Sequence, residues 1–395
     1  MRWFGFGFNA FAQICDVDKS DEGESCAAAV KVSSPTELSE HVDGNRRWKT
    51  SQITASWSRR AALHGDGELR DSCVCVAGFG SDVSSCCGTC VAHSYGCVNV
   101  FISETHLTLA FPHKIETWDL QKKEETPSWS MDLEAQSDCF AGLTLPLVPG
   151  GYIQSNPPFY RPLSAHMGAK RLALGAEHAV LLTASGAVYT WGLGSHGQLG
   201  HGGLTPEEKP KPVEALWGMI MGSVSAGGWH SVCVSDGGDL YVWGWNESGQ
   251  LGLPSQSLRK ASQKKEDCSK QTGASSPEDP QEEGKQEDVF ISIQAFPALV
   301  DVTPLCEIRT VSCGSRHTAA ATTAGDLYTW GWGEYGQLGH QTFSSSDEPQ
   351  RVEFFAAEQI YVVDVVCGNW NTFVAINEEI DLRIENKHRL EHLEI

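Results

Sequence analysis

Three histidines, His178, His230 and His317, stand at matching places in near copies of one motif. Imidazole nitrogen is a common zinc ligand, so three histidines brought together could hold a metal ion. A tryptophan of the same motif follows each histidine after 13 residues: Trp191, Trp243 and Trp330. Because equivalent residues of successive repeats in a ring lie on different radii, we predict structural histidines and tryptophans that pin neighbouring strands, not a metal site.

Cysteines between positions 73 and 97 are the second set that could do chemistry. Cys87 and Cys90 have the C-x-x-C spacing of zinc ligands, and Cys73 and Cys75 could supply a second pair. No second C-x-x-C follows, and the region reads as a degraded repeat. Free thiols are therefore the favoured interpretation, these four residues remain weak metal candidates, and no cofactor is expected.

No set of residues typical of an enzyme stands out. The glycines of Gly5-Phe6-Gly7 and of the repeated W-G-x-G segments lack the strand-turn-helix context of a nucleotide loop. No Ser/His/Asp or Cys/His set can be assembled. We predict no catalytic residues and no enzyme activity.

The elements that position these residues repeat along the chain. The pattern G-x-x-H…W-G-x-G-x-x-G-Q-L-G, in slightly varied form, ends at 200, 252 and 339, and each copy contains an apolar hairpin followed by a further strand. Units of about four antiparallel strands with a period near 50 residues are typical of a β-propeller. We predict an all-β propeller of six or seven four-stranded blades.

The two ends of the chain indicate how the ring closes. Residues 360–376 open a fourth unit, with Asn371 at the histidine position, but no W-G segment follows. The segment F-G-F-N-A-F-A-Q at 6–13 aligns without a gap with W-G-W-N-E-S-G-Q at 243–250. We therefore predict one blade built from N- and C-terminal strands, which protects the edges of the sheet.

A single propeller domain is expected over residues 1–380, with a tail at 381–395. Within it we expect a closing blade shared by 1–16 and 360–376, degenerate blades over 17–169, and three regular repeats over 170–356. In the irregular part, 55–69 resembles 226–240 and should begin a blade, another is expected around 98–147, and a seventh could lie in 17–47 or 120–170.

An insertion explains the uneven spacing of the histidines. His178 and His230 are 52 residues apart, whereas His230 and His317 are 87 apart. The surplus falls on the polar segment 255–289, which holds too few apolar residues to offset its ordering entropy. We predict a disordered insertion within that blade.

The composition is that of a packed, acidic chain. It has 29 basic and 50 acidic residues among 395, a net charge of −21. That charge disfavours direct binding to nucleic acid, which needs clustered Lys and Arg. Neither a secretory leader nor a membrane span is expected, so the 14 cysteines are expected to be free thiols of a reducing compartment.

Binding residues are expected in the loops of one rim, since loops on a rigid scaffold carry recognition. The candidates vary among the fixed glycines of the motif: His196, Asn246, Glu247, Glu334 and Tyr335. A simple turn-filling role is the alternative for each of them.

The repeated pattern resembles the regulator of chromosome condensation family of propellers. Members of that family divide into guanine-nucleotide exchangers, chromatin binders and scaffolds for other enzymes. This chain departs from the exchanger prototype, because its N-terminus closes the ring in place of a basic tail. The irregular segment 17–170 offers no motif onto which exchanger residues can be carried.

Further segments, including N-P-P-F-Y-R-P-L at 156–163, are similar to one vertebrate member of this family. That resemblance implies a non-enzymatic scaffold or adaptor of a nuclear JmjC-type 2-oxoglutarate oxygenase, in a histone demethylase complex linked to histone lysine methylation and chromosome segregation. It implies a nuclear, chromosome-associated protein with some cytoplasmic presence and at most indirect contact with histones. The alternative is a guanine-nucleotide exchange factor for a small GTPase.

Overall fold

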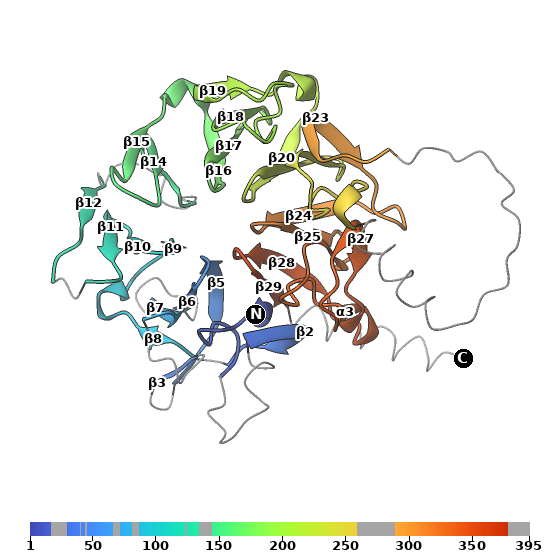
Figure 1. Cartoon of the computed structure of the whole chain (residues 1–395). Coiled ribbons are helices and arrows are strands. Elements are labelled where there is room, and N and C mark those ends of the chain that lie inside the picture. Colours follow the sequence, from blue (N-terminus) through green and yellow to red (C-terminus); the bar gives the residue numbers. More distant parts are fainter. Residues whose placement is uncertain are drawn as a thin grey trace, which may run out of the picture.

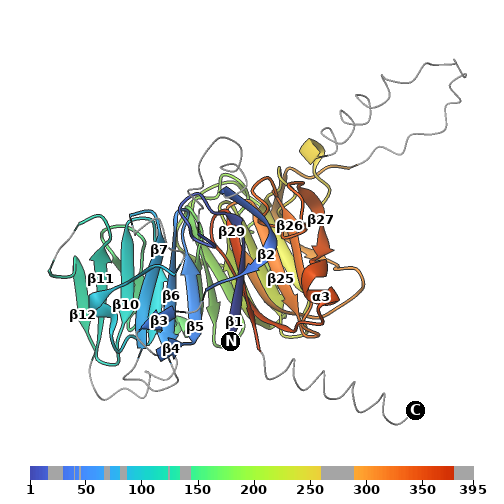
Figure 2. The ribbon, with the colours of Figure 1, turned by 90° about the horizontal axis from the view of Figure 1, so that it is seen from below.

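The computed structural model describes residues 1–16, 30–39, 41–43, 46–65, 72–80, 87–122, 125–133, 144–258 and 289–377. They form a ring of seven β-sheets around a central axis, which is a seven-bladed β-propeller (Figure 1). Seen from the side, the blades make a thick disk (Figure 2). The prediction of an all-β propeller is confirmed, and the blade count is seven.

The irregular half of the chain forms the first three blades. Blade 1 contains β5 (Thr50–Ala55), β6 (Arg59–Gly65), β7 (Ser72–Gly78) and β8 (Thr89–Cys90). Blade 2 contains β9 (Asn99–Ile102), β10 (His106–Ala110), β11 (Lys114–Asp119) and β12 (Trp129–Asp132). Blade 3 contains β13 (Leu147–Val148), β14 (Gly151–Ile153) and β15 (Tyr160–Pro162).

The regular repeats form blades 4 to 6. Blade 4 contains β16 (Ala169–Leu174), β17 (His178–Thr183), β18 (Val188–Gly192) and β19 (Glu207–Pro212). Blade 5 contains β20 (Met221–Ala226), β21 (His230–Ser235), β22 (Leu240–Trp245) and β23 (Ile293–Val300). Blade 6 contains β24 (Ile308–Cys313), β25 (His317–Thr322), β26 (Leu327–Gly331) and β27 (Ser346–Arg351).

Blade 7 joins the two ends of the chain. It contains β28 (Val362–Cys367), β29 (Asn371–Ile376), β1 (Arg2–Phe8) and β2 (Lys31–Glu37). Gly7 pairs with Asn371 as Gly244 pairs with His230 in blade 5, so the ungapped alignment of the N-terminal segment is reproduced in the register. The predicted closure of the ring by strands from both termini is confirmed.

Short elements connect the blades. They are the hairpin β3 (His41–Asp43) and β4 (Arg46–Trp48), the 3-10 turns η1 (Ala92–Ser94), η3 (Ala165–Met167) and η4 (Glu214–Leu216), and the helix α3 (Glu353–Ala357). The segment 17–47 therefore contributes β2 and this hairpin, while the seventh blade comes from 147–162. Blade 3 departs from the predicted four strands, since the described residues give it three.

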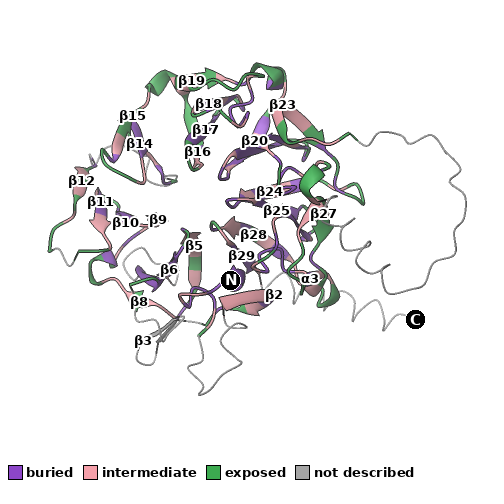
Figure 3. Ribbon diagram, in the orientation of Figure 1, coloured by how far each residue is buried: buried purple, intermediate pink, exposed green. Residues whose placement is uncertain are grey.

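Burial explains why the second strands of blades 4 to 6 hold no charged residue and are apolar at their centres. Every residue of β17 and β25 is buried, because both faces of these sheets pack against neighbouring blades (Figure 3). One such core lies between blades 5 and 6, where Val242 and Leu251 meet Val311 and Trp330. The outer strands β19 and β27 carry charges and proline, which discourage pairing with another chain.

Parts of the predicted domain boundaries fall outside the described residues. They include positions 17–29 of the predicted degenerate blades, 259–288 of the predicted insertion, 378–380 at the end of the predicted propeller domain, and the whole predicted tail at 381–395. At the start of the insertion, Ser255 is buried and its hydroxyl donates to the Glu247 carbonyl at 2.8 Å.

Candidate partner-binding surface

The repeated histidines join each blade to the next. His178 Nε2 lies 2.8 Å from Ser231 Oγ, and Ser231 donates its proton to the Gln198 carbonyl at 2.8 Å. Since the hydroxyl proton is used in that bond, the imidazole N–H is the donor in the first contact. The same arrangement recurs twice: His230 with Thr318 and the Gln250 carbonyl, and His317 with Thr372 and the Gln337 carbonyl.

The tryptophans reinforce this link from the following blade. Trp243 Nε1 donates to the Gln198 carbonyl at 2.8 Å, and Trp330 makes the same contact one blade further on, at 3.0 Å. Trp191 follows the irregular blade 3, and its Nε1 donates to the Tyr152 hydroxyl at 3.2 Å instead. The residues that repeat are therefore held inside the wall of the ring.

Burial also sets the protonation of the three histidines. It lowers the pKa of His178 to about 4 and the pKa of His230 and His317 to about 3. All three are neutral near pH 7. A general acid or base works best with a pKa close to the operating pH, so these histidines are unsuited to that chemistry.

One rim of the disk carries the positions that the repeat leaves free to vary. These are the residue before the histidine position and the residue after the W-G glycine, which a backbone hydrogen bond joins in blade 1 and in blades 4 to 7. The pairs are Glu177 with Leu193, Trp229 with Trp245, Arg316 with Trp332, Trp370 with Phe8, and Ser58 with Phe79. Because β1 ends at Phe8, this rim faces away from the N-terminus labelled in Figure 2.

Aromatic side chains dominate this rim, and we call them the aromatic arc. Its members are Phe79, Phe11, Trp57, Phe8, Trp370, Tyr335, Trp332, Trp245, Trp229 and His196. The first seven of these residues, from Phe79 to Trp332, form the larger of two groups. The centroids of neighbouring rings in this group lie 4.9–6.2 Å apart. Trp57 is 45% exposed and Phe79 51% exposed, so these rings are open to solvent.

A second group lies over blades 4 to 6. The rings of Trp229 and Trp245 are 5.5 Å apart, and the His196 ring lies 5.4 Å from that of Trp245. The Arg316 guanidinium lies 4.6 Å from the Trp245 ring centroid, a cation–π distance. The Arg316 carbonyl accepts the backbone N–H of Trp332, which links this group to the larger one.

Charged residues surround the arc. Glu177, Glu247 and Glu334 are exposed in its loops, and Trp229 Nε1 donates to Glu177 Oε2 at 3.2 Å. Lys31 Nζ lies 5.5 Å from the Tyr335 ring centroid. The surface thus combines an apolar centre with an ionic margin, which is the usual anatomy of a protein interface.

The predicted contact residues fall into two classes. His196 and Tyr335 belong to the aromatic arc, and Glu247 and Glu334 are exposed beside it. The prediction that Asn246 contacts a partner is wrong, because its side chain is fully buried and is therefore out of reach of a partner. It holds its own loop: Nδ2 donates to the carbonyls of Leu253 and Ile291, and Oδ1 accepts the N–H of Leu251.

The sequence interpretation missed the tryptophans of the arc. Trp229, Trp245, Trp332 and Trp370 occupy variable positions beside the fixed histidine and glycine. Tryptophan recurring at unconstrained rim positions was the available signal, because no packing requirement of the repeat places it there.

Two hollows in the surface lie beside the irregular blade 3. A cavity of about 270 Å³ between blades 3 and 4 is lined by Tyr152, Glu177 and Trp191 among others. Another, of about 510 Å³, lies between blades 2 and 3 beside Trp129 and Phe159. The inner strands enclose a central cavity of about 550 Å³.

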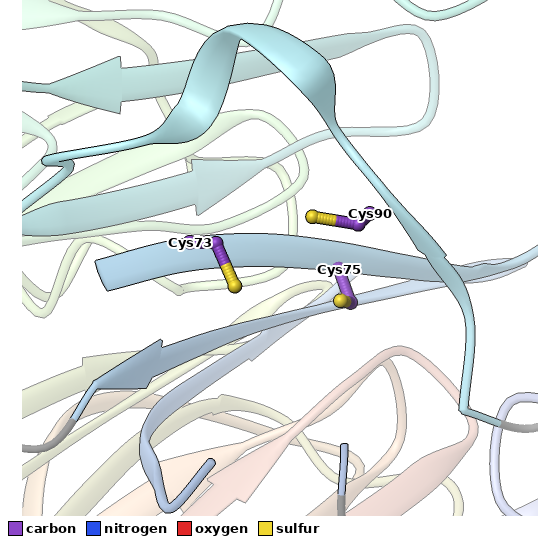
Figure 4. Close-up of side chains that lie close together, drawn as sticks. All are labelled: Cys73, Cys75 and Cys90. Atoms are coloured by element: carbon purple, nitrogen blue, oxygen red, sulfur yellow. The ribbon is translucent and has the colours of Figure 1, made fainter. Parts of the chain in front are cut away.

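Three of the four weak metal candidates come together in blade 1. The Sγ atoms of Cys73, Cys75 and Cys90 all lie within 4.8 Å of one another (Figure 4). Within the described part of the chain this is the one such group of three or more metal-ligating residues, and Cys87 is not part of it.

Comparison with known proteins agrees with this architecture. A model of the Regulator of chromosome condensation (RCC1) repeat matches residues 185–234, 237–321 and 324–375, and a second RCC1 repeat model matches 169–198, 223–250 and 308–337. The chain belongs to the RCC1 repeat family of β-propeller proteins.

Two mammalian relatives are similar over nearly the whole chain. RCC1 domain-containing protein 1 of Homo sapiens is 41% identical over 397 residues, which cover 94% of this chain and 96% of that protein. The Mus musculus protein of the same name is 38% identical over 400 residues, with the same coverage. The predicted family, and the similarity to this vertebrate member, are confirmed.

A solved structure shares the fold at low sequence identity. Prp20p of Saccharomyces cerevisiae, described with its binding properties to Gsp1p and histones, superimposes with a TM-score of 0.67 at 16% identity. The match covers 98% of this chain and 94% of that one. In the described part of this chain, no helix is both long and apolar enough to cross a membrane.

Proposed function

We propose that this chain is a non-enzymatic propeller adaptor whose aromatic arc binds a nuclear JmjC-type 2-oxoglutarate oxygenase. Through that partner it would act in control of histone lysine methylation and in chromosome segregation, and it would be nuclear and chromosome-associated. The partner class is the one implied by the resemblance to RCC1 domain-containing protein 1. Similarity along 94% of the chain supports a shared role, since it extends through the irregular blades as well as the repeats.

The aromatic arc is the observation that carries the proposal. Tryptophan, tyrosine and arginine are enriched at protein interfaces and at their energetic centres. Here tryptophan or arginine occupies the variable positions of the consecutive blades 5, 6 and 7, and these residues lie on one face of the ring with Tyr335 beside them. A rigid platform loses little entropy on binding, so such a surface suits a stable docking role.

Two further features bear on this proposal: the first disfavours catalysis by the repeated histidines, and the second indicates the kind of partner surface. The repeated histidines donate their N–H groups within the wall of the ring and are neutral near pH 7. The acidic margin, including Glu177 and Glu334, favours a partner surface with basic side chains around an apolar patch.

Co-purification from nuclear extract tests the partner directly. The tagged full-length chain should recover a JmjC-type oxygenase, and Trp245→Ala together with Trp332→Ala should reduce recovery by about tenfold or more. Trp217→Ala is the matched control, because Trp217 is 65% exposed but lies outside the arc. Unchanged recovery in the double variant would contradict the binding role of the aromatic arc. Recovery of no oxygenase would contradict the proposed partner.

A nucleotide-release assay separates this function from exchange activity. The purified chain is mixed with a panel of small GTPases loaded with a fluorescent guanine nucleotide. Under the adaptor proposal the release rate stays at its spontaneous value. Accelerated release would instead favour a guanine-nucleotide exchange factor.

A further inference from the structure

Blade 1 presents three thiols on one face of its sheet. Cys73 and Cys75 are two residues apart on β7, so their side chains project to the same side. Cys90 on β8 stands directly opposite Cys75 in the register. Strand alternation and pairing together therefore bring the three Sγ atoms within 4.8 Å of one another (Figure 4).

We propose that Cys73, Cys75 and Cys90 form a binding site for a thiophilic d¹⁰ cation, Zn²⁺ or Cu⁺. Zinc–thiolate bonds of about 2.3 Å place the sulfur atoms of a tetrahedral site about 3.8 Å apart. From separations of at most 4.8 Å, each Sγ needs to move by about 0.6 Å to reach that geometry. Three cysteines converging on one point suit soft ions, since thiolate is their preferred ligand.

The surroundings of the thiols would largely shield a bound ion from water. Cys73 and Cys75 are each 2% exposed, and Cys90 is half-buried. The hydrogen bond with Cys73 and burial raise the pKa of the Cys75 thiol, and burial raises that of Cys90. A bound cation would displace the thiol protons, and its charge would balance that of the thiolates. The partial exposure of Cys90 gives the ion a path of entry.

The place of the cluster suggests what the ion would do. The outer strand β8 has two residues, and only Cys75–Cys90 and Val76–Thr89 are paired in its register with β7. By contrast, the outer strands β19 and β27 of the regular blades are six residues long. A metal held by both strands would fasten β8 to β7 where the hydrogen-bonded ladder is short. The ion is therefore structural, and its binding free energy would stabilise the blade.

Metal analysis of the full chain tests the site. The reduced, chelator-treated protein is titrated separately with Zn²⁺ and with Cu⁺, and bound metal is measured by mass spectrometry after desalting. One equivalent per chain is expected for at least one of the two ions, and comparison of the two titrations tells which. Co²⁺ should give the near-ultraviolet charge-transfer absorption of thiolate ligands.

Matched variants locate the ion. Cys75→Ser and Cys90→Ser should lose the bound equivalent, whereas Cys97→Ser should keep it, because Cys97 is a buried thiol outside the cluster that hydrogen bonds to the Asn99 carbonyl. Failure of both ions to bind the wild-type chain would overturn the proposal. So would retention of the metal in both cluster variants.

Thiol protection in the wild-type chain gives a readout that needs no variant. Bound metal should slow alkylation of Cys90 on the order of tenfold, measured by peptide mass spectrometry, and a chelator should restore the rate. Cys306, half-buried and outside the cluster, is the internal control. Equal alkylation rates of Cys90 with and without metal would also contradict a metal site.

Discussion

His230 Nε2 lies 3.0 Å from Thr318 Oγ1 in the following blade, 88 residues further along the chain. Thr318 in turn donates to the carbonyl of Gln250, which belongs to the blade of His230. These two hydrogen bonds therefore connect the sheets of blades 5 and 6, and the side chains of His230 and Thr318 are both buried. Blade-to-blade cohesion in this propeller depends on such polar links as well as on apolar packing.

Replacing His230 should weaken the ring measurably. His230→Ala removes a buried side chain and leaves the Thr318 hydroxyl without its donor, so the free energy of unfolding should fall by about 3 kcal/mol. Chemical denaturation of the full chain measures this loss. His166→Ala, at an exposed position, should change stability by less than about 0.5 kcal/mol. Equal effects in the two variants would show that the contact contributes nothing.

The same histidines should make stability fall in mild acid. Their ordinary pKa of 6.5 applies in the unfolded chain, whereas in the folded chain it is about 4 for His178 and about 3 for His230 and His317. The unfolded state therefore binds protons first as pH decreases. The stabilisation is fully present above pH 6.5 and is lost as pH falls toward 3–4, by about 2 kcal/mol per histidine at pH 5.

Blade 7 has asparagine in place of the repeated histidine, which suggests a control variant for this pH effect. Asn371 stands at the histidine position there, and its Nδ2 donates to the Phe8 carbonyl at 3.3 Å. His230→Asn should therefore retain a donor without a titrating group. Between pH 6 and 4.5 its stability should depend on pH less steeply than that of the wild type, by about 1.2 kcal/mol per pH unit. An unchanged slope would contradict the assignment of the titration to His230.

Closure of the ring by β1 gives a third prediction. Deleting residues 1–14 removes a strand paired on both sides, with β29 and with β2, and exposes Phe373 and Val374 of the core. We expect loss of the cooperative thermal transition or poor solubility. Deleting 259–288 should lower the melting temperature far less, because that polar sequence is predicted to be an insertion. Similar melting curves for the two deletions would contradict this closure.

The regular part of the fold could be predicted because its packing fixes residue types. Gly7, for example, has φ +113°, and a Cβ there would lie 2.5 Å from the Trp370 carbonyl oxygen, so glycine recurs at that place in each copy. Blade 3 could not be predicted in this way. Its strands are two to three residues long and carry no copy of the motif, so periodicity gives no signal.

The binding surface was harder to predict for a related physical reason. The repeat marks residues that hold the ring, whereas recognition uses positions that the ring does not constrain, such as Trp245 and Trp332. Asn246 was misassigned because a polar residue in a loop suggests solvent exposure. Asn9, which aligns with it, shows the actual role: its Oδ1 accepts the Ile14 N–H at 2.8 Å, as Asn246 accepts that of Leu251.

The indole N–H groups provide the last prediction. Trp243→Phe removes the indole N–H that donates to the Gln198 carbonyl. Because that carbonyl still accepts the hydroxyl of Ser231, the free energy of unfolding should fall by about 1 kcal/mol. Blade 7 tolerates this state, since Phe6 takes the tryptophan position there and is fully buried. Trp191→Phe should cost less, because its acceptor, the Tyr152 hydroxyl, can rotate toward other partners. Denaturant unfolding of both variants measures the difference, and a larger loss for Trp191→Phe would contradict the role assigned to the Gln198 carbonyl.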